Sequence, residues 1–391
     1  MRGAMAWTVL LVIGLSVACT GNGAPVPLED LQLPEVRADS VVLELGSYDG
    51  SHDAFTRVAA VVPGNAGALA VLLHPENEVR VFDADGGFLH RFAGRGQGPG
   101  EFVAPRMAGT VDGRIWVLDQ QLRRLSFFDW QGSLEGTLAL REDPPAHDEV
   151  RWRRAGVLAG DRLLLRPAAP RRFEADSLPL VTLELREGSE AADTLVRLAR
   201  PARTPPAVQV GGVHLLAAGT EQGRPPVTAD HTLVAPAFDG RSVLLAERHA
   251  SPAAGKGLVR LVRLSVEGDE IAEVQLVRPR ASAPPRAEAP SGAGSDFDDF
   301  LDYLYQEDHL PVATELRAGV DGSVWVGVEG TNETTEAWWI FDENLEPVSQ
   351  VRLEAGLEVM QVAGDRVWTV KHDDLGIPRV QLRLLTPAGG G

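Results

Sequence analysis

A repeated strand-and-turn unit constrains this chain more than any other feature of its sequence. The segment "VDGRIWVLDQQLRRLSFFDWQGSLEGTLAL" begins at Val111, and "VDGSVWVGVEGTNETTEAWWIFDENLEPVSQVRL" begins at Val320. Each contains an Asp-Gly turn, an apolar strand with a tryptophan (Trp116 or Trp325), a second strand that ends in Phe-Asp, another turn and a third strand. Asp-Gly suits a tight hairpin because Gly adopts positive φ at little cost. The two segments therefore indicate one structural unit that is used more than once.

Looser copies of the unit occur elsewhere. They are "GALAVLLHPENEVRVFDADGGFLHRF" from Gly67, "AGDRLLLR" from Ala159, "FDGRSVLLAE" from Phe238 and "AGDRVWTVK" from Ala363. Six turns of this kind can be counted, and the closest are about 45 to 48 residues apart. That spacing is the length of a four-stranded propeller blade. The sequence therefore predicts an all-β fold, a six-bladed β-propeller of four-stranded antiparallel blades.

The two ends of the predicted propeller complement each other. The last unit supplies three strands, "LEVMQVA", "RVWTVK" and "RVQLRLL", and the chain then ends in "TPAGGG". The stretch "DSVVLELGS" from Asp39 alternates correctly for a strand and has no partner of its own. Pairing it with the last unit would remove two exposed sheet edges. We therefore expect the propeller to span residues 39–391, with its ring closed by the N-terminal strand.

Two insertions interrupt the blades. The Pro-rich region at about 200–230 contains "VQVGGVHLLAAG", which is either a hairpin excursion or the remnant of a seventh blade. The second insertion, at about 279–310, contains "SDFDDFLDYLYQED", in which apolar residues follow helical spacing after Ser295, a suitable N-cap. We expect one short helix there. It either seals a blade junction or covers the channel.

The N-terminus has the features of an export signal. Arg2 precedes an apolar run of about 13 residues, too short for a bilayer span, and residues 1–18 are predicted to be a signal peptide. Cys19 is the only cysteine, and "SVAC" resembles the lipobox of bacterial lipoproteins, in which the cysteine is acylated. The alternative is an ordinary signal peptide that contains a cysteine. Residues 19–38 are expected to be a flexible tether, so the predicted location is the bacterial cell envelope, with a lipid anchor in a membrane.

Composition excludes several function classes. A formal net charge of −18 repels phosphate backbones, so nucleic acid is not an expected partner. A lipidated Cys19 would leave the mature chain without a thiol for catalysis, disulfides or metal binding. We expect a monomer without a cofactor.

A glycine-rich stretch, "RFAGRGQGPGEFVAP", could be a phosphate cradle, a linker or a structural connector. It lacks the Gly-Lys-Ser/Thr ending of a phosphate-binding loop, its Pro99 has no N–H to donate, and "EFVAP" follows where such a loop requires a helix. The connector interpretation is favoured, with glycines that allow tight turns, a packed Phe102, and Glu101 bound to a backbone donor or Arg95. The residues of this predicted connector motif are Gly94, Gly96, Gly98, Pro99, Gly100, Glu101 and Phe102.

These motifs together carry a family resemblance. "GRGQGPGEFVAP", followed by "DGRIWVLD" and "RRLSFFDWQG", resembles the signature of six-bladed propeller lipoproteins related to the NHL-repeat family. The final segment "VWTVKHDDLGIPRVQLRLL" is similar to the last blade of that group. The resemblance implies a ring whose face binds protein, peptide or nucleic acid. It implies no particular activity.

Residues that could carry chemistry are scattered. His372, Asp373 and Asp374 form an "HDD" turn, and His231 lies beside Asp230. Six-bladed lactonases hold calcium with Glu, Asn and Asp side chains from several blades, and Glu76 and Asn77 are residues of these types, but exposed acidic turns explain such residues more simply. Trp116, Trp325 and Trp368 are expected to pack between sheets, whereas Trp130, in a turn, is a candidate contact residue.

The function predicted from these observations is non-catalytic. We expect an exported binding or scaffolding propeller that engages a protein or a cell-envelope glycan, with Trp130, His231, His372, Asp373 and Asp374 as candidate binding residues. The alternative is a calcium-dependent hydrolase of the lactonase or gluconolactonase type.

Overall fold

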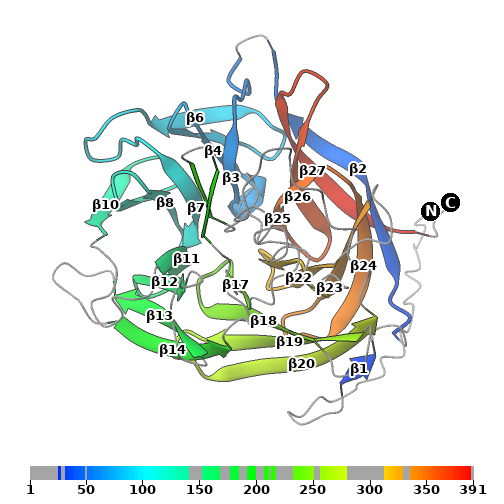
Figure 1. Ribbon diagram of the computed structural model, residues 1–391. Coiled ribbons are helices and arrows are strands. Elements are labelled where there is room, and N and C mark those ends of the chain that lie inside the picture. Colours follow the sequence, from blue (N-terminus) through cyan, green and yellow to red (C-terminus); the bar gives the residue numbers. More distant parts are fainter. Residues whose placement is uncertain are drawn as a thin grey trace, which may run out of the picture.

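The computed structural model describes residues 25–27, 31–48, 51–140, 152–167, 177–184, 192–199, 207–210, 213–216, 232–250, 256–279, 312–328 and 335–388. Within these ranges the chain is almost entirely β-strand, and the one helix is a short 3₁₀ turn at Asn65–Gly67. The strands form antiparallel sheets arranged around a central axis, as in a β-propeller (Figure 1). The all-β, propeller-like prediction is confirmed.

Three of the sheets have four antiparallel strands each. The first contains β3 (Val58–Pro63), β4 (Leu69–Leu73), β5 (Glu78–Phe82) and β6 (Phe88–Ala93). The second contains β7 (Pro105–Val111), β8 (Arg114–Asp119), β9 (Arg124–Phe128) and β10 (Leu134–Ala139). The third contains β11 (Trp152–Leu158), β12 (Arg162–Pro167), β13 (Ser177–Glu184) and β14 (Ala192–Ala199).

The remaining sheets are larger or smaller. A five-stranded sheet contains β17 (Leu233–Pro236), β18 (Ser242–Ala250), β19 (Lys256–Ser265) and β20 (Glu270–Pro279), with β1 (Val26–Pro27) parallel to β20. An eight-stranded sheet contains, in order, β21 (Glu315–Ala318), β22 (Val324–Val328), β23 (Thr335–Phe341), β24 (Pro347–Glu354), β2 (Glu35–Leu45), β27 (Pro378–Pro387), β26 (Arg366–His372) and β25 (Glu358–Val362). β15 (Ala207–Val210) and β16 (Val213–Leu216) form a separate hairpin.

The N-terminal strand joins the two ends of the propeller. β2 pairs antiparallel with β27, from Val36 opposite Pro387 to Leu45 opposite Val380, as predicted for the strand from Asp39. β2 also pairs with β24, in parallel, through three residues that begin at Glu35. The described strands therefore do not form six separate four-stranded sheets, because β2 hydrogen-bonds on both edges and merges the last two groups of strands into one sheet.

The first strand of each group lies nearest the axis. β3, β7, β11, β17, β21 and β25 contact one another in this order, and β25 contacts β3, so that they enclose the axis (Figure 1). The turns between first and second strands meet at one end of this ring, which we call the turn end. Four hydrogen bonds join neighbouring groups there. The donors and acceptors are Arg114 Nη2 and Asp161 Oδ1 (2.9 Å), Ala159 N–H and Gly240 O (2.9 Å), Arg263 Nη2 and Gly322 O (2.7 Å), and Gly364 N–H and Asp321 Oδ2 (2.6 Å). The opposite end, where the chain passes from one group to the next, is called the connection end.

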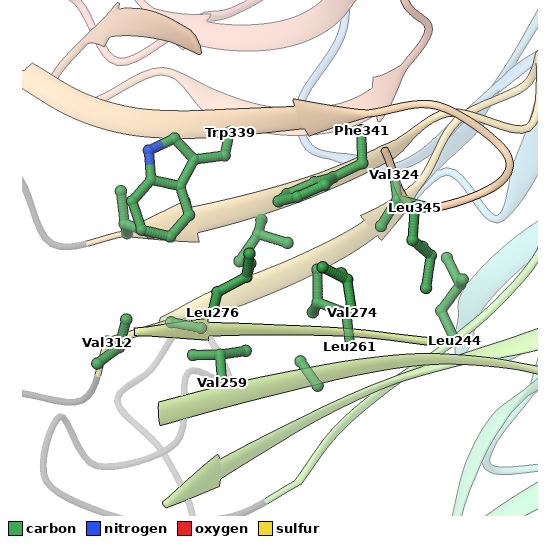
Figure 2. Packing of buried hydrophobic residues seen from close by; sticks show 14 of the residues in the cluster. Leu244, Val259, Leu261, Val274, Leu276, Val312, Val324, Trp339, Phe341 and Leu345 are labelled. Atoms are coloured by element: carbon green, nitrogen blue, oxygen red, sulfur yellow. The ribbon is translucent and has the colours of Figure 1, made fainter. Parts of the chain in front are cut away.

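Hydrophobic side chains fill the wedges between neighbouring groups. Figure 2 shows one such cluster, in which Leu244, Leu261 and Leu276 from the five-stranded sheet face Trp339 and Phe341 of β23. Trp116, Trp325 and Trp368 are almost completely buried, each in a different cluster. Packing between sheets, the role predicted for these tryptophans, is confirmed.

Turn chemistry explains the sequence repeat. Asp112 and Gly113 both have positive φ (48° and 77°), which a tight turn between β7 and β8 requires and which glycine adopts most easily. The repeated Phe-Asp pair has a second role. Asp83, Asp129 and Asp342 each follow the third strand of a group and accept hydrogen bonds from the N–H groups two and four residues later. The aspartate therefore satisfies the backbone of the turn into the fourth strand.

Two other predictions concern the insertions. The segment containing "VQVGGVHLL" forms the hairpin β15–β16, which pairs with no other strand that the structure describes. The helix predicted after Ser295 lies outside the described residues. No helix within the described ranges is long and apolar enough to cross a membrane.

Candidate functional site

A central cavity lies along the axis of the propeller. Its volume is about 370 Å³, and residues from all six first strands line it. Much of its wall consists of small side chains such as Ala59, Ala108 and Ala155, because six strands converge on a narrow space. Gly109 is required for a further reason, since a Cβ there would lie 2.7 Å from the indole of Trp116.

The cavity has few polar side chains, and two of its three charged residues are arginines. The charged residues that line it are Arg106 on β7, Arg317 on β21 and Glu358 on β25. Arg317 Nη2 donates to Glu315 Oε2 at 3.2 Å, and Gln361 Nε2 donates to the carbonyl oxygen of Ala318. Neither Arg106 nor Glu358 forms an ion pair with another described residue, and both side chains are exposed to solvent.

Two more basic residues, Arg57 and His74, lie at the connection end of the first group of strands. Arg57 immediately precedes β3, and His74 immediately follows β4. Burial, together with the positive charges of Arg106 and Arg57, lowers the pKa of His74 below its ordinary value. This effect places the three side chains in one electrostatic neighbourhood.

The next group of strands adds two more arginines to this end. Arg153 on β11 is directly opposite Arg166 on β12 in the sheet register. Burial and the neighbouring charge of Arg153 lower the pKa of Arg166. Arginines therefore gather at the connection end of β3, β7 and β11, at the mouth of a cavity whose wall also contains Glu358.

Asp373, one of the candidate binding residues, is already bonded on several sides. Its Oδ1 accepts hydrogen bonds from the N–H groups of Leu375 and Ile377, and its Oδ2 accepts the Tyr48 hydroxyl at 2.5 Å. Arg379 Nη2 lies 3.1 Å from the same oxygen. The hydrogen bond from Tyr48, followed by those from the backbone and Arg379, lowers the pKa of Asp373 to about 2. This carboxylate caps the β26–β27 turn and ties it to the residues after β2.

The neighbours of Asp373 are differently placed. His372 ends β26 and is opposite Pro378 of β27, and Asp374 lies in the turn. Both side chains are exposed at the connection end, but neither lines the cavity.

Trp130 lies at the turn end and contacts the neighbouring group of strands. A Cβ placed on Gly64 would fall 2.4 Å from the Trp130 ring, so the ring sits directly on the backbone of the β3–β4 turn. Trp130 also packs against the apolar cluster between the first two groups. This side chain therefore joins two groups of strands.

The glycine-rich stretch forms a compact loop between β6 and β7. Gly96 N–H donates to Phe102 O (3.0 Å), and Phe102 N–H donates to Gly94 O (2.8 Å). Gly98 N–H donates to Glu101 Oε2 at 2.8 Å, the backbone contact expected for this glutamate. Gly100, which follows Pro99, has φ of +76°, where a glycine is favoured. The loop uses its own N–H groups internally, so a phosphate would find few donors.

Side chains from the next sheet hold this loop in place. Arg124 donates to the carbonyl oxygens of Gln97, Gly98 and Glu101. Phe102 is fully buried and meets Phe128 edge to face, with ring centroids 6.0 Å apart. The loop is a rigid connector in this structure.

Asp119, at the end of β8, binds the backbone that follows the loop. Its side chain is fully buried, and its carboxylate accepts hydrogen bonds from the N–H groups of Val103 (2.6 Å), Ala104 (3.0 Å) and Leu122 (2.8 Å). Asn77 donates to the carbonyl oxygens of Phe102 and Val103. Asn77, considered above as a calcium ligand, therefore has its amide nitrogen committed to the connector. Its carbonyl oxygen, the atom that would bind a cation, is buried without a hydrogen-bond partner among the described residues.

Two candidate residues lie outside the described ranges. They are Cys19, with the predicted signal and tether around it, and His231.

The described residues give little support to a metal centre. They include no group of three or more His, Cys, Asp or Glu side chains arranged to hold a metal ion. Glu358 is the one carboxylate among the described residues that line the cavity, whereas Ca²⁺ sites use six to eight oxygen ligands, several of them carboxylates. The described lining therefore offers too few oxygen ligands for a calcium site of this kind.

Sequence reasoning did not identify the basic mouth. Arg106 and Arg153 each lie seven residues before the glycine of the following turn, Gly113 or Gly160. This shared position in two consecutive units was the available signal. Comparing the positions of charged residues between units, as was done for turns and aromatic residues, would have found it.

Comparison with known proteins identifies the fold and no more. No protein-family model matches the chain, and no curated protein matches it. A solved structure of a member of the DUF4221 family from Bacteroides vulgatus covers 90% of this chain and 98% of its own, with 8% identity and a TM-score of 0.50. A protein of Bacteroides fragilis predicted to be exported covers the same shares, with 12% identity and a TM-score of 0.47. The β-propeller domain of Cps50 (Swd1) from Myceliophteria thermophila covers 88% of this chain and 99% of its own, with 10% identity and a TM-score of 0.38.

Proposed function

We propose that this chain is an exported, non-catalytic β-propeller that binds a protein or a cell-envelope glycan at the connection end of its ring. The observation that carries the proposal is the cavity of about 370 Å³ that opens among cationic side chains and has one described carboxylate in its wall. Propellers commonly bind ligands where strands converge on the axis, and cavities of a few hundred Å³ hold small organic groups. The connection end is therefore the preferred binding face.

The lengths of the connections support the same face. Turns at the turn end are mostly short, as between Val111 and Arg114. The longest stretches between consecutive sheets start and end at the connection end, including those from Ala199 to Leu233 and from Pro279 to Glu315. In repeat proteins, insertions into successive units commonly map to the binding face.

The proposal includes the division of the strands into six blades. The eight-stranded sheet can be divided into β21–β24 and the group β25, β26, β27 and β2, which meet through only three parallel residue pairs. Six first strands around the axis support this division. Under it, the short β2–β24 pairing joins the outer strands of the fifth and sixth groups.

The lipoprotein assignment is also part of the proposal. Acylation of Cys19 would tether the propeller to a membrane, as a monomer, through the residues before β1. The tether would be shorter than the predicted residues 19–38, because Val26–Pro27 pair with β20 and β2 begins at Glu35. A fatty-acid analogue should label the wild-type chain and not Cys19→Ser. Labelling that persists in the variant would contradict acylation at this cysteine.

A binding assay with a cavity-filling variant tests the function. Full-length protein is immobilised, and envelope fractions are applied before and after protease treatment or periodate oxidation, to separate protein from glycan partners. Met360→Trp narrows the cavity, and Val348→Trp places the same bulk on an outer strand where the side chain is half exposed.

Binding should weaken with Met360→Trp and remain with Val348→Trp, in variants whose melting temperatures match the wild type. Calcium-dependent hydrolysis of lactones by the wild type would contradict the proposal in favour of the lactonase alternative. The absence of binding to every envelope fraction would also refute it.

A further inference from the structure

The basic mouth is unusual for a chain with a formal net charge of −18. We infer that the mouth of the central cavity, along the starts of β7 and β11, binds a small organic anion through its carboxylate or phosphate group. This inference rests on the proposed binding function and specifies the chemistry of the ligand.

The first argument is the convergence of positive charge from different strands. Arg106 lines the cavity, and its charge, with that of Arg57, acts on His74. The three residues belong to two neighbouring groups of strands, so the fold brings them together. The charges of Arg57 and Arg106 repel each other, and on His74 they act against the opposite charge of Glu76.

Arg153 and Arg166 extend the same surface. They face each other across β11 and β12, and Arg166 is largely removed from solvent. Arg153 is exposed, whereas the charged form of Arg166 is disfavoured both by burial and by the charge of Arg153. A bound oxyanion would offset both effects.

Some carboxylates at the connection end are hydrogen-bonded to other groups. Glu358, in the cavity wall, has no ion-pair partner among the described residues, and it lies on β25, which stands between β21 and β3 in the ring and not beside β7 or β11. Among the described residues, Glu76 accepts a hydrogen bond from the Thr56 N–H, and Glu315 pairs with Arg317. Asp119 accepts three backbone N–H groups, as described above. No carboxylate in the described part of the chain pairs with Arg57, Arg106, Arg153 or Arg166. These four arginines therefore have no ion-pair partner among the described residues, and a bound anion would supply one.

Guanidinium groups favour planar or tetrahedral oxyanions. An arginine can donate two parallel hydrogen bonds to a carboxylate or a phosphate, a geometry that lysine cannot supply. Small aliphatic residues around Arg106 leave room for the rest of the ligand inside the cavity. A single sugar acid or sugar phosphate has suitable charge and size.

Isothermal titration of the full chain with three probes tests the inference. D-glucuronate carries a carboxylate, glucose 6-phosphate carries a phosphate, and glucose is the neutral control. At least one anion should bind, more tightly than glucose and more weakly as salt concentration rises, because salt screens exposed charges. The anion that binds more tightly shows whether the site prefers a carboxylate or a phosphate.

Substitutions test whether the anion binds at the mouth of the cavity. Arg106→Gln and Arg153→Gln should each weaken binding by about tenfold or more, the usual effect of losing a charged hydrogen bond. Arg106→Lys keeps the charge and should recover part of the loss, which distinguishes ligand contact from misfolding. Arg91→Gln removes the same charge from the outer strand β6, where the side chain is 63% exposed, and should change nothing.

Two outcomes would overturn the inference. One is binding of neither anion, or equal binding of glucose. The other is anion binding that Arg106→Gln and Arg153→Gln leave intact, which would place the anion elsewhere. If envelope fractions still bind the wild type and both variants equally, the proposed function stands and only the anion site fails.

Discussion

Truncation of Phe102 is the sharpest test of how the connector loop works. Phe102 lies in the glycine-rich stretch, is fully buried and packs edge to face on Phe128. Burying a phenylalanine removes about 150–250 Å² from water, and at about 25 cal/mol per Å² this contributes several kcal/mol. Phe102→Ala removes most of that area and leaves a cavity, so the free energy of unfolding should fall by about 3–5 kcal/mol.

Urea unfolding followed by tryptophan fluorescence measures this loss. Gln97→Ala is the matched control, because its exposed side chain lies in the same loop and only its backbone carbonyl oxygen is used. The control should change the free energy of unfolding by no more than about 0.5 kcal/mol. A loss below about 1 kcal/mol for Phe102→Ala would refute the connector role, as would lost partner binding at unchanged stability.

Three further predictions concern turns and connectors. Gly100→Ala forces an alanine to φ near +76° and should cost about 1–2 kcal/mol in chemical denaturation, whereas Gly136→Ala, where a Cβ has open space, should cost less. Asp119→Ala leaves three backbone N–H groups without their acceptor and should lower stability by about 3 kcal/mol or more; a loss as small as that of an exposed aspartate would contradict the described bonding. Asp373 has its pKa lowered from 3.8 to about 2, so its contribution is present above its unfolded pKa and is lost as pH falls through about 2. Thermal melts between pH 2 and 6 should therefore show a smaller acid-induced loss in Asp373→Asn than in the wild type or in Asp374→Asn, and identical slopes would count against the Tyr48 and Arg379 contacts.

The fold could be read from the sequence because its determinants are local. Asp112-Gly113 and Asp321-Gly322 set tight turns, and the alternating strands between them place Trp116 and Trp325 at the same position of each unit. The pairing of β2 with β27 could also be inferred, because an unpaired strand at one terminus matched a missing strand at the other. The second pairing of β2, with β24, had no sequence signal, since three parallel residue pairs leave no pattern.

The role of the repeated Phe-Asp pair was not predicted. Its aspartates, such as Asp129 and Asp342, are fixed by hydrogen bonds to backbone N–H groups within the same turn. Asp373 resembles them in this respect, which is why an acidic turn residue looked like a ligand in the sequence but is committed to structure. Distinguishing the two uses requires the geometry of the turn.

The basic mouth depends on relations between units and could not be read from any single segment. Arg106 on β7 and Arg153 on β11 come from different sheets, and only the ring arrangement places their strands side by side. Their effect also depends on which carboxylates are already occupied. Asp119 and Glu315, for example, are acidic residues, but in the structure Asp119 accepts backbone N–H groups and Glu315 pairs with Arg317.

The most direct test of the account is a crystal structure of the full-length protein soaked with the tighter-binding of D-glucuronate and glucose 6-phosphate. The account predicts ligand density in the central cavity, with the carboxylate or phosphate against Arg106 at the connection end. Density at the turn end beside Trp130, or a ligand bound away from every arginine of the mouth, would contradict it.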